Sequence, residues 1–134
     1  MIVNRIYQIS EKEFVEIISR SKQKQRIHIV ELDGSKIQKW KDYIEIIEEK
    51  YEFPTTCIDS IDRYMDWMRD LQWLQCEEYI MAIHNVKSFL SGDPKANKIV
   101  MDGFGNSILP YWQEEVEKCC VGGKAKPFNV YLID

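Results

Sequence analysis

Apolar residues recur along the chain at two different spacings, which predict alternating helices and strands. Three short runs are almost continuously apolar and are typical of strands: residues 27–32 (IHIVEL), 79–86 (YIMAIHNV) and 128–133 (FNVYLI). Between them, apolar residues return every three or four positions, as they do in amphipathic helices. This alternation favours an α/β fold with a small three-stranded parallel sheet, joined by right-handed helical crossovers.

Start and stop signals set the bounds of the expected helices. Ser10 followed by Glu13 has the spacing of a capping box, and Pro94 can occupy the first position of a helix. A glycine-containing segment, residues 102–106, is expected to interrupt the helix that Pro94 opens. The expected helices cover residues 10–19, 35–50, 59–71, 94–101 and 109–120.

The length and composition of the chain indicate one folded domain. Its 134 residues, of which 45% are apolar and 12% aromatic, are enough to bury a core. We expect residues 26–134 to form the α/β domain. We expect residues 1–25 to form an N-terminal extension with a short helix and the basic linker RSKQKQR, which runs over residues 20–26.

The sequence points neither to a membrane nor to secretion. No apolar run approaches the roughly eighteen residues that a membrane span requires, and acidic residues interrupt the N-terminus where a signal peptide would be apolar. The four cysteines include one adjacent pair and no C-x-x-C motif. Reduced thiols in a cytoplasmic protein are therefore the favoured interpretation, and we expect the free chain to be a monomer.

Acidic residues are concentrated on one side of the helix expected to begin at Asp59 or Ser60. At about 100° per residue, four aspartates fall within about 80° of one another. Two of the i,i+4 pairs are like-charged, and each costs an isolated helix roughly 0.2–0.5 kcal/mol. The pattern therefore predicts a docking surface for a positively charged partner. The acidic side consists of Asp59, Asp62, Asp66 and Asp70, and the apolar side, expected to hold the helix on the sheet, of Ile61, Tyr64, Met65, Met68 and Leu71.

The net charge of the chain comes entirely from this region. Residues 54–78 contain six acids and two bases, which gives −4, whereas residues 1–53 carry ten of each sign and residues 79–134 carry six of each. An ordinary solvated helix face remains the alternative interpretation of these charges.

The stretch FPTTCIDSIDRYMDWMRDLQWL, residues 53–74, resembles the signature of the barstar-like family of bacterial ribonuclease inhibitors. The chain departs from that signature in the loop of residues 56–60 (TCIDS), where the family has Tyr-aromatic-Gly-x-Asn, and at Met65, where the family has Trp. In element order the resemblance extends over residues 26–134 and implies a barstar-like fold. Aligned on Phe53-Pro54, the chain keeps Asp62, Asp66, Asp70-Leu71 and Trp73-Leu74 in register.

The resemblance implies an inhibitor or immunity protein that binds a basic ribonuclease or related nuclease toxin and occludes its active site. Asp66 matches the carboxylate that the family places in the catalytic cleft, and Asp62 matches its supporting acid. The loop residues Thr55, Thr56 and Cys57 occupy the place where relatives present Tyr and Gly to the enzyme. Trp67, at the border of the two helix faces, either edges the interface or closes the core. The expected partner-binding residues are Asp59, Asp62, Asp66, Asp70, Thr56, Cys57 and Trp67.

The sequence offers little for catalysis or for metal binding. His28 and His84 lie within expected strands and lack the spacing of zinc ligands. Neither Gly103-Phe104-Gly105 nor Gly122-Gly123 has the residues of a phosphate loop. We therefore expect no enzyme activity, no cofactor and no metal.

Two other functions remain open at this point. The acidic helix could belong to a non-inhibitory binding module for another basic protein. Alternatively, the cations of residues 20–26 could contact RNA phosphates while the acidic helix is inert. Because no aromatic residue is interleaved with these cations, a solvated linker is the favoured interpretation, and direct nucleic-acid binding is not expected.

Overall fold

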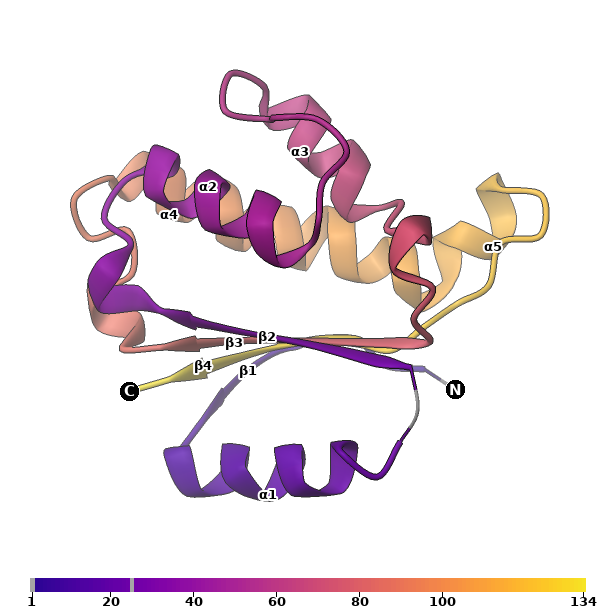
Figure 1. The fold of residues 1–134 in the computed structure, drawn as a ribbon, viewed down its shortest axis with the longest axis horizontal. Coiled ribbons are helices and arrows are strands. Elements are labelled where there is room, and N and C mark those ends of the chain that lie inside the picture. The colour runs from indigo at the N-terminus through magenta and orange to yellow at the C-terminus, as the bar shows by residue number, and fades with distance from the viewer. Residues whose placement is uncertain (1, 25) are drawn as a thin grey trace.

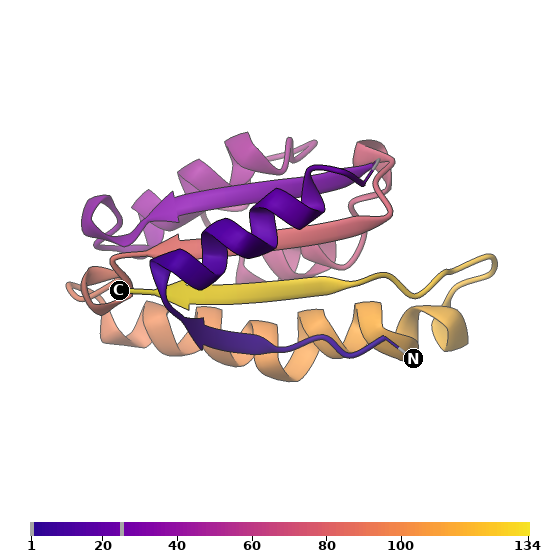
Figure 2. The ribbon, with the colours of Figure 1, turned by 90° about the horizontal axis from the view of Figure 1, so that it is seen from below.

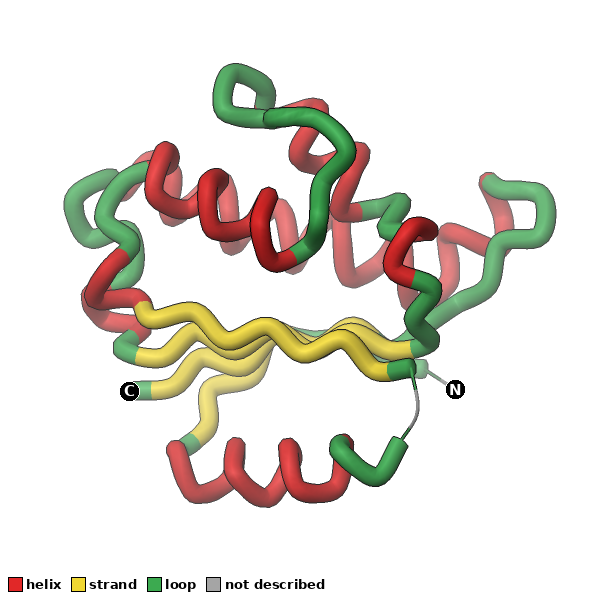
Figure 3. Tube along the Cα trace, viewed as in Figure 1, coloured by secondary structure: helices red, strands yellow, loops and turns green. Residues whose placement is uncertain are grey.

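A parallel sheet forms the middle layer of the computed structural model, and helices cover both of its faces (Figure 1; Figure 3 distinguishes helices from strands). The structure describes residues 2–24 and 26–134, so Met1 and Gln25, which fall in the predicted extension and linker, lie outside the described residues. One face carries α1 (Glu11–Ser21); the other carries α2 (Trp40–Lys50), α3 (Ile61–Met68), α4 (Pro94–Gly103) and α5 (Val116–Cys119).

The sheet has four strands, one more than predicted, so the prediction of a three-stranded sheet is wrong. The additional strand, β1, belongs to the predicted N-terminal extension and pairs in parallel with β4, with Ile6 opposite Val130 (Figure 2). Only two of its four residues, the isoleucines at its ends, are partly buried, so the apolar pattern of this segment is too short to indicate a strand. In spatial order the strands are β1 (Ile6–Ile9), β4 (Phe128–Ile133), β3 (Glu78–His84) and β2 (Ile27–Asp33), all parallel.

The apolar run at residues 79–86 corresponds to a central strand, β3, that is covered on both faces. Five consecutive residues of β3, from Tyr79 to Ile83, are buried. A central parallel strand contacts helices on both faces of the sheet, so its side chains must be apolar throughout. An edge strand can keep polar side chains at its solvent-exposed positions. This confirms that the run at 79–86 is a buried strand, although the strand itself ends at His84.

The last helical segment runs without interruption from Pro94 to Cys119, so the predicted break at residues 102–106 is wrong. Two π-helical turns, η4 (Phe104–Ile108) and η5 (Tyr111–Glu115), lie within it. A π-helical turn accommodates an additional residue, so the glycines bend the helix path without ending it. At Gly103 a Cβ atom would lie 2.9 Å from Met65 Cε, so the missing side chain lets α3 pack closely here.

The second helix begins at Trp40, five residues later than predicted. The carboxylate of Asp33 accepts hydrogen bonds from the backbone N–H and the hydroxyl of Ser35, at 3.0 and 2.7 Å, and caps a single 3-10 turn, η1 (Gly34–Lys36). The chain is then extended until Asp42 caps two backbone N–H groups ahead of the helix. Local capping by aspartate therefore overrides the helical periodicity of this segment.

Buried side chains on one side of α3 attach it to the rest of the domain. Tyr64 and Met68 are fully buried. The hydroxyls of Tyr64 and of Tyr43 on α2 lie 2.6 Å apart, and Trp112 Nε1 donates to the carbonyl of Met68 at 2.9 Å. Ile61, which was expected on the buried side, is instead 42% exposed. The helix is thus anchored by Tyr64 and Met68 and not by its first residue.

This anchoring predicts unequal effects of two truncations on the same helix. Met68→Ala should lower the free energy of unfolding by about 2–5 kcal/mol, because it leaves a cavity in the core. Ile61→Ala should change it by no more than about 0.5 kcal/mol, because the side chain is exposed. Urea denaturation followed by circular dichroism measures both. Equal losses would contradict the observed orientation of α3.

The capping carboxylate at the end of β2 predicts an acid-dependent loss of stability. Hydrogen bonds from Ser35, and then from Asn85, lower the pKa of Asp33 from its ordinary 3.8 to about 2. A lowered folded-state pKa stabilises the fold above the ordinary value, and this contribution is lost as the pH falls through the folded-state value. The difference in unfolding free energy between wild type and Asp33→Asn should therefore shrink from pH 4 towards pH 2. A difference that is constant over this range would argue against the capping role.

Candidate functional site

The acidic helix is shorter than predicted, and it divides the four aspartates. Its first turn is capped by the Ser60 hydroxyl, which accepts the backbone N–H of Arg63 at 3.0 Å. The helix ends at Met68, and Leu71 has a positive φ of 53°, so the chain leaves the helical path there. Because the capping hydroxyl fixes the first turn, the residues before Ser60 cannot continue the helical row.

The predicted row of four aspartates on one helix is therefore wrong in its two outer members. Asp59 precedes the capping residue, and Asp70 follows the end of the helix. Asp62 and Asp66 remain on α3, four residues apart, and both are exposed. Residues at this spacing lie on the same helix face, with about 5–6 Å between their Cβ atoms.

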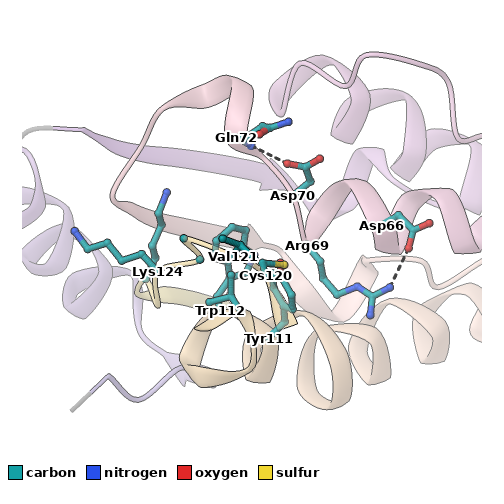
Figure 4. A pocket seen from close by; sticks show the side chains of 13 residues that line it. Asp66, Arg69, Asp70, Gln72, Tyr111, Trp112, Cys120, Val121 and Lys124 are labelled. Atoms are coloured by element: carbon teal, nitrogen blue, oxygen red, sulfur yellow. Dashed lines mark hydrogen bonds and ion pairs between the residues drawn. The ribbon is translucent and has the colours of Figure 1, made fainter. Parts of the chain in front are cut away.

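Asp66 has a counter-ion within its own chain. Arg69 Nη2 lies 3.0 Å from Asp66 Oδ1, and Arg69 Nε donates to the carbonyl of Met65 at 3.2 Å (Figure 4). The Asp66 side chain nevertheless remains 72% exposed. An exposed ion pair contributes only about 0–1 kcal/mol, so a cation from another protein can replace Arg69 at little cost. The i,i+3 spacing of these two residues was the available sequence signal for this pair.

A cavity of about 590 Å³ lies between the C-terminal end of α3 and the loop that follows α5 (Figure 4). Its lining combines both signs of charge with aromatic and thiol groups. The acidic face of α3 therefore borders a surface that carries charges of both signs. The charged residues that line the cavity are Asp66, Arg69, Asp70, Lys124 and Lys126.

The loop before α3 is held by Glu48 on α2, a residue that the sequence interpretation missed. Its carboxylate accepts hydrogen bonds from the Thr56 hydroxyl, at 2.8 Å, and from the backbone N–H of Cys57. Arg63 Nη1 donates to the carbonyl of Thr56 at 3.0 Å. Thr56 is exposed, so this predicted contact residue lies on the surface next to the acidic helix.

Cys57 is fully buried, so the structure contradicts its predicted place on the partner-facing surface. It packs in the core as a small apolar side chain. Burial, with the negative charge of Glu48, raises the pKa of the Cys57 thiol to about 11. The backbone N–H of this residue donates to the Glu48 carboxylate while its side chain lies in the core.

Trp67 packs against the core, which is one of the two roles that the sequence left open. Its Nε1 donates to the Thr55 hydroxyl at 3.1 Å, which ties α3 to the preceding loop. Its ring packs edge-on against Trp73, with centroids 5.5 Å apart, and Trp73 Nε1 donates to the carbonyl of Tyr51 at 2.8 Å. The half-buried indole thus supports the loop from the border of the acidic face.

The two histidines make packing and ion-pair contacts. Burial lowers the pKa of His28, whose ring lies 5.2 Å from that of Tyr51. The ring nitrogens of His84 lie 3.2 Å from a Glu11 carboxylate oxygen and 2.9 Å from one of Glu31, linking α1 to the sheet. Among the described residues, no three His, Cys, Asp or Glu side chains are grouped to hold a metal. None of the described helices is both long and apolar enough to cross a membrane.

The basic linker and the acidic helix are separated by the sheet. The linker follows α1, which covers the face opposite to α3 (Figure 1). Within it, Lys24 pairs with Glu78 at 3.2 Å. The two charged segments therefore belong to different surfaces.

Comparisons with known proteins were made for the sequence and for the fold. A family model described as "Barstar (barnase inhibitor)" matches residues 27–131. No curated protein sequence matches the chain. A solved structure, that of the Aeropyrum pernix ORC2 protein in ADPNP–ADP complexes, matches with a TM-score of 0.51 and 10% identity over 98% of this chain and 34% of that one. The chain spans about a third of that protein's length, and the likeness is one of fold alone.

The contacts of Glu48 predict that it orders the loop before α3. Glu48→Ala should lower the free energy of unfolding by about 1–3 kcal/mol, because two donors lose a charged acceptor. It should also speed hydrogen exchange at the Cys57 amide. Glu49→Ala is the matched control, since this exposed neighbour on α2 makes neither contact. Similar exchange rates in the two variants would contradict the role of Glu48.

Proposed function

The chain belongs to the barstar family, and we propose that it is a protein inhibitor of a bacterial ribonuclease or of a related nuclease toxin. The family match includes α3 and the elements that support it. In this proposal the exposed face of α3 enters the active site of the nuclease and excludes the substrate. Such an inhibitor would act in the cytosol of the cell that makes it.

The chemistry of a nuclease explains why an acidic helix can block it. A cleft that binds a nucleic acid must attract phosphates, so it presents cationic side chains. Asp62 and Asp66 offer two carboxylates at a fixed helical spacing, and these can replace phosphates as partners. Charge-assisted hydrogen bonds of this kind are short and strong, and opposite fields accelerate the encounter of the two proteins.

The observation that carries the proposal is the contrast between the two sides of α3. Asp62 and Asp66 are exposed, while Tyr64 and Met68 on the same helix are fully buried. A helix anchored in this way presents its carboxylates in one geometry before it meets a partner. Binding then requires little further ordering, which favours affinity.

The surroundings of α3 bear on which nuclease is bound. Because Cys57 is buried, the loop can offer Thr55 and Thr56 to a partner, and Thr56 stands where the family signature has Tyr. Asp59 and Asp70 flank the helix and can contact only the margins of a cleft that receives Asp66. We therefore propose a cognate enzyme whose contacts to this loop differ from those usual in the family.

A second candidate is a non-inhibitory module that binds another basic protein through the same face. The Asp66–Arg69 pair favours it, because a carboxylate with its own counter-ion attracts a cationic cleft less strongly. The two candidates differ in one measurable respect. An inhibitor stops catalysis at a stoichiometric ratio, whereas a binding module leaves catalysis unchanged.

Neutralising the central carboxylate tests the proposal. Wild-type protein should inhibit a nuclease encoded beside its gene, with barnase as a second probe, in a stoichiometric titration of RNA cleavage. Asp66→Asn should raise Kd by at least about thirtyfold, or about 2 kcal/mol, because a desolvated cation loses its partner. Glu16→Gln removes the same charge from α1, on the opposite face of the sheet, and should leave Kd unchanged.

Each contrary result has a separate meaning. Equal Kd values for wild type and Asp66→Asn would contradict the assignment of the site. Binding without inhibition would contradict the inhibitor and support the second candidate. No binding to either nuclease would count against the proposed function itself.

A further inference from the structure

Two adjacent thiols are exposed at the C-terminal end of α5. Cys119 Sγ and Cys120 Sγ lie 3.3 Å apart, and Cys120 Sγ lies 3.3 Å from the hydroxyl oxygen of Tyr111. Both cysteines are exposed, whereas Cys57 is buried and Cys76 is partly buried. The pair and Tyr111 belong to the end of the long helical segment, and Cys120 forms part of the cavity wall in Figure 4.

The surroundings of Cys120 favour its thiolate form. Its hydrogen bonds with the Tyr111 hydroxyl and the Cys119 thiol lower the pKa of Cys120. The pKa of Cys119 is raised, so Cys120 is the first of the two to ionise. Asp70 acts in the opposite direction, and the cations that line the cavity have other partners: Arg69 pairs with Asp66, Lys124 with Glu77, and Lys126 donates to the carbonyl of Cys76. An exposed thiol with a lowered pKa is typical of a reactive cysteine.

We propose that Cys119 and Cys120 form a dithiol site that reacts with small hydroperoxides, with Cys120 as the attacking thiolate and Cys119 as the resolving thiol. The inference does not depend on the proposed function. It rests on the short distance between the two sulfurs, on their exposure and on the donor at Tyr111.

The reaction has two steps. The Cys120 thiolate attacks one oxygen of the hydroperoxide, the O–O bond breaks, and the departing alkoxide takes a proton to leave as an alcohol, or as water from hydrogen peroxide. This gives a sulfenic acid at Cys120. Cys119 then loses its proton, attacks the Cys120 sulfur and displaces hydroxide, which leaves as water. Two thiols are oxidised to one disulfide, and the peroxide accepts the two electrons.

The product should be easily reduced. Adjacent Cα atoms are about 3.8 Å apart across a trans peptide, whereas disulfides usually join Cα atoms about 4.4–6.8 Å apart. A bond between neighbouring cysteines is therefore held away from its preferred geometry, and thiol exchange reopens it readily. The oxidised state would be a reversible modification.

The chain contains its own unreactive thiols. Burial raises the pKa of Cys57 to about 11, and burial also raises the pKa of Cys76. Neither thiol should react while the protein is folded, because the thiolate is the nucleophile. Both serve as internal controls in every experiment.

Oxidation of the folded protein by stoichiometric hydrogen peroxide at neutral pH tests the proposal, with alkylation, proteolysis and mass spectrometry as the readout. In the wild type, the peptide with Cys119 and Cys120 should lose two hydrogen atoms and regain them with dithiothreitol. Cys119→Ser should accumulate a sulfenic acid at Cys120 that dimedone traps. Cys120→Ser should lose the reaction. Oxidation of Cys57 or Cys76 before this pair, or an undiminished reaction in Cys120→Ser, would overturn the proposal.

The hydroxyl at position 111 provides the finer test. Tyr111→Phe should slow substoichiometric alkylation of Cys120 by iodoacetamide several-fold, because the thiolate loses a donor. Tyr7→Phe removes an exposed tyrosine hydroxyl from β1, away from the thiols, and should react like the wild type. Unchanged circular dichroism shows that each variant is folded. Equal alkylation rates in Tyr111→Phe and wild type would overturn the assignment of Cys120 as the activated thiol.

Discussion

Burial of one side of α3 is the constraint on which the candidate site depends. The helix has only eight residues, and an isolated helix of that length is not stable in water. Tyr64 and Met68 supply the missing stability from the core, and the Tyr43 hydroxyl fixes the helix against α2. Because these contacts determine the rotation of α3, they also determine that Asp62 and Asp66 face outward.

The electrostatic character of the site is more balanced than the net charge suggests. Arg69 pairs with Asp66, and the neighbouring cavity contains two lysines. An exposed pair is easily exchanged, so the surface remains available to a stronger external cation. The thiols of the chain have opposite environments: burial raises the pKa of Cys57, whereas hydrogen bonds with Tyr111 and Cys119 lower the pKa of Cys120.

Most of the fold could be predicted from local patterns. The strand at residues 128–133 was predicted with its observed bounds, and those at 27–33 and 78–84 to within two residues, because short runs rich in apolar and β-branched residues mark strands. The barstar family was recognised from the acidic segment, and the family match supports it. The edge strand β1 escaped prediction because it pairs with β4 at the other end of the chain, and the unbroken helix from Pro94 escaped because π-helical turns continue it through residues 104–108.

For the candidate site, the sequence by itself determined which residue types are present and that acids recur at helical spacing. The tertiary structure decided which of them share a surface. Ser60 and Leu71 limit α3 so that only Asp62 and Asp66 lie on it, and Cys57, whose backbone N–H donates to Glu48, lies in the core. Periodicity describes an ideal helix, but where a helix begins, ends and points is set by caps and by packing partners elsewhere in the chain.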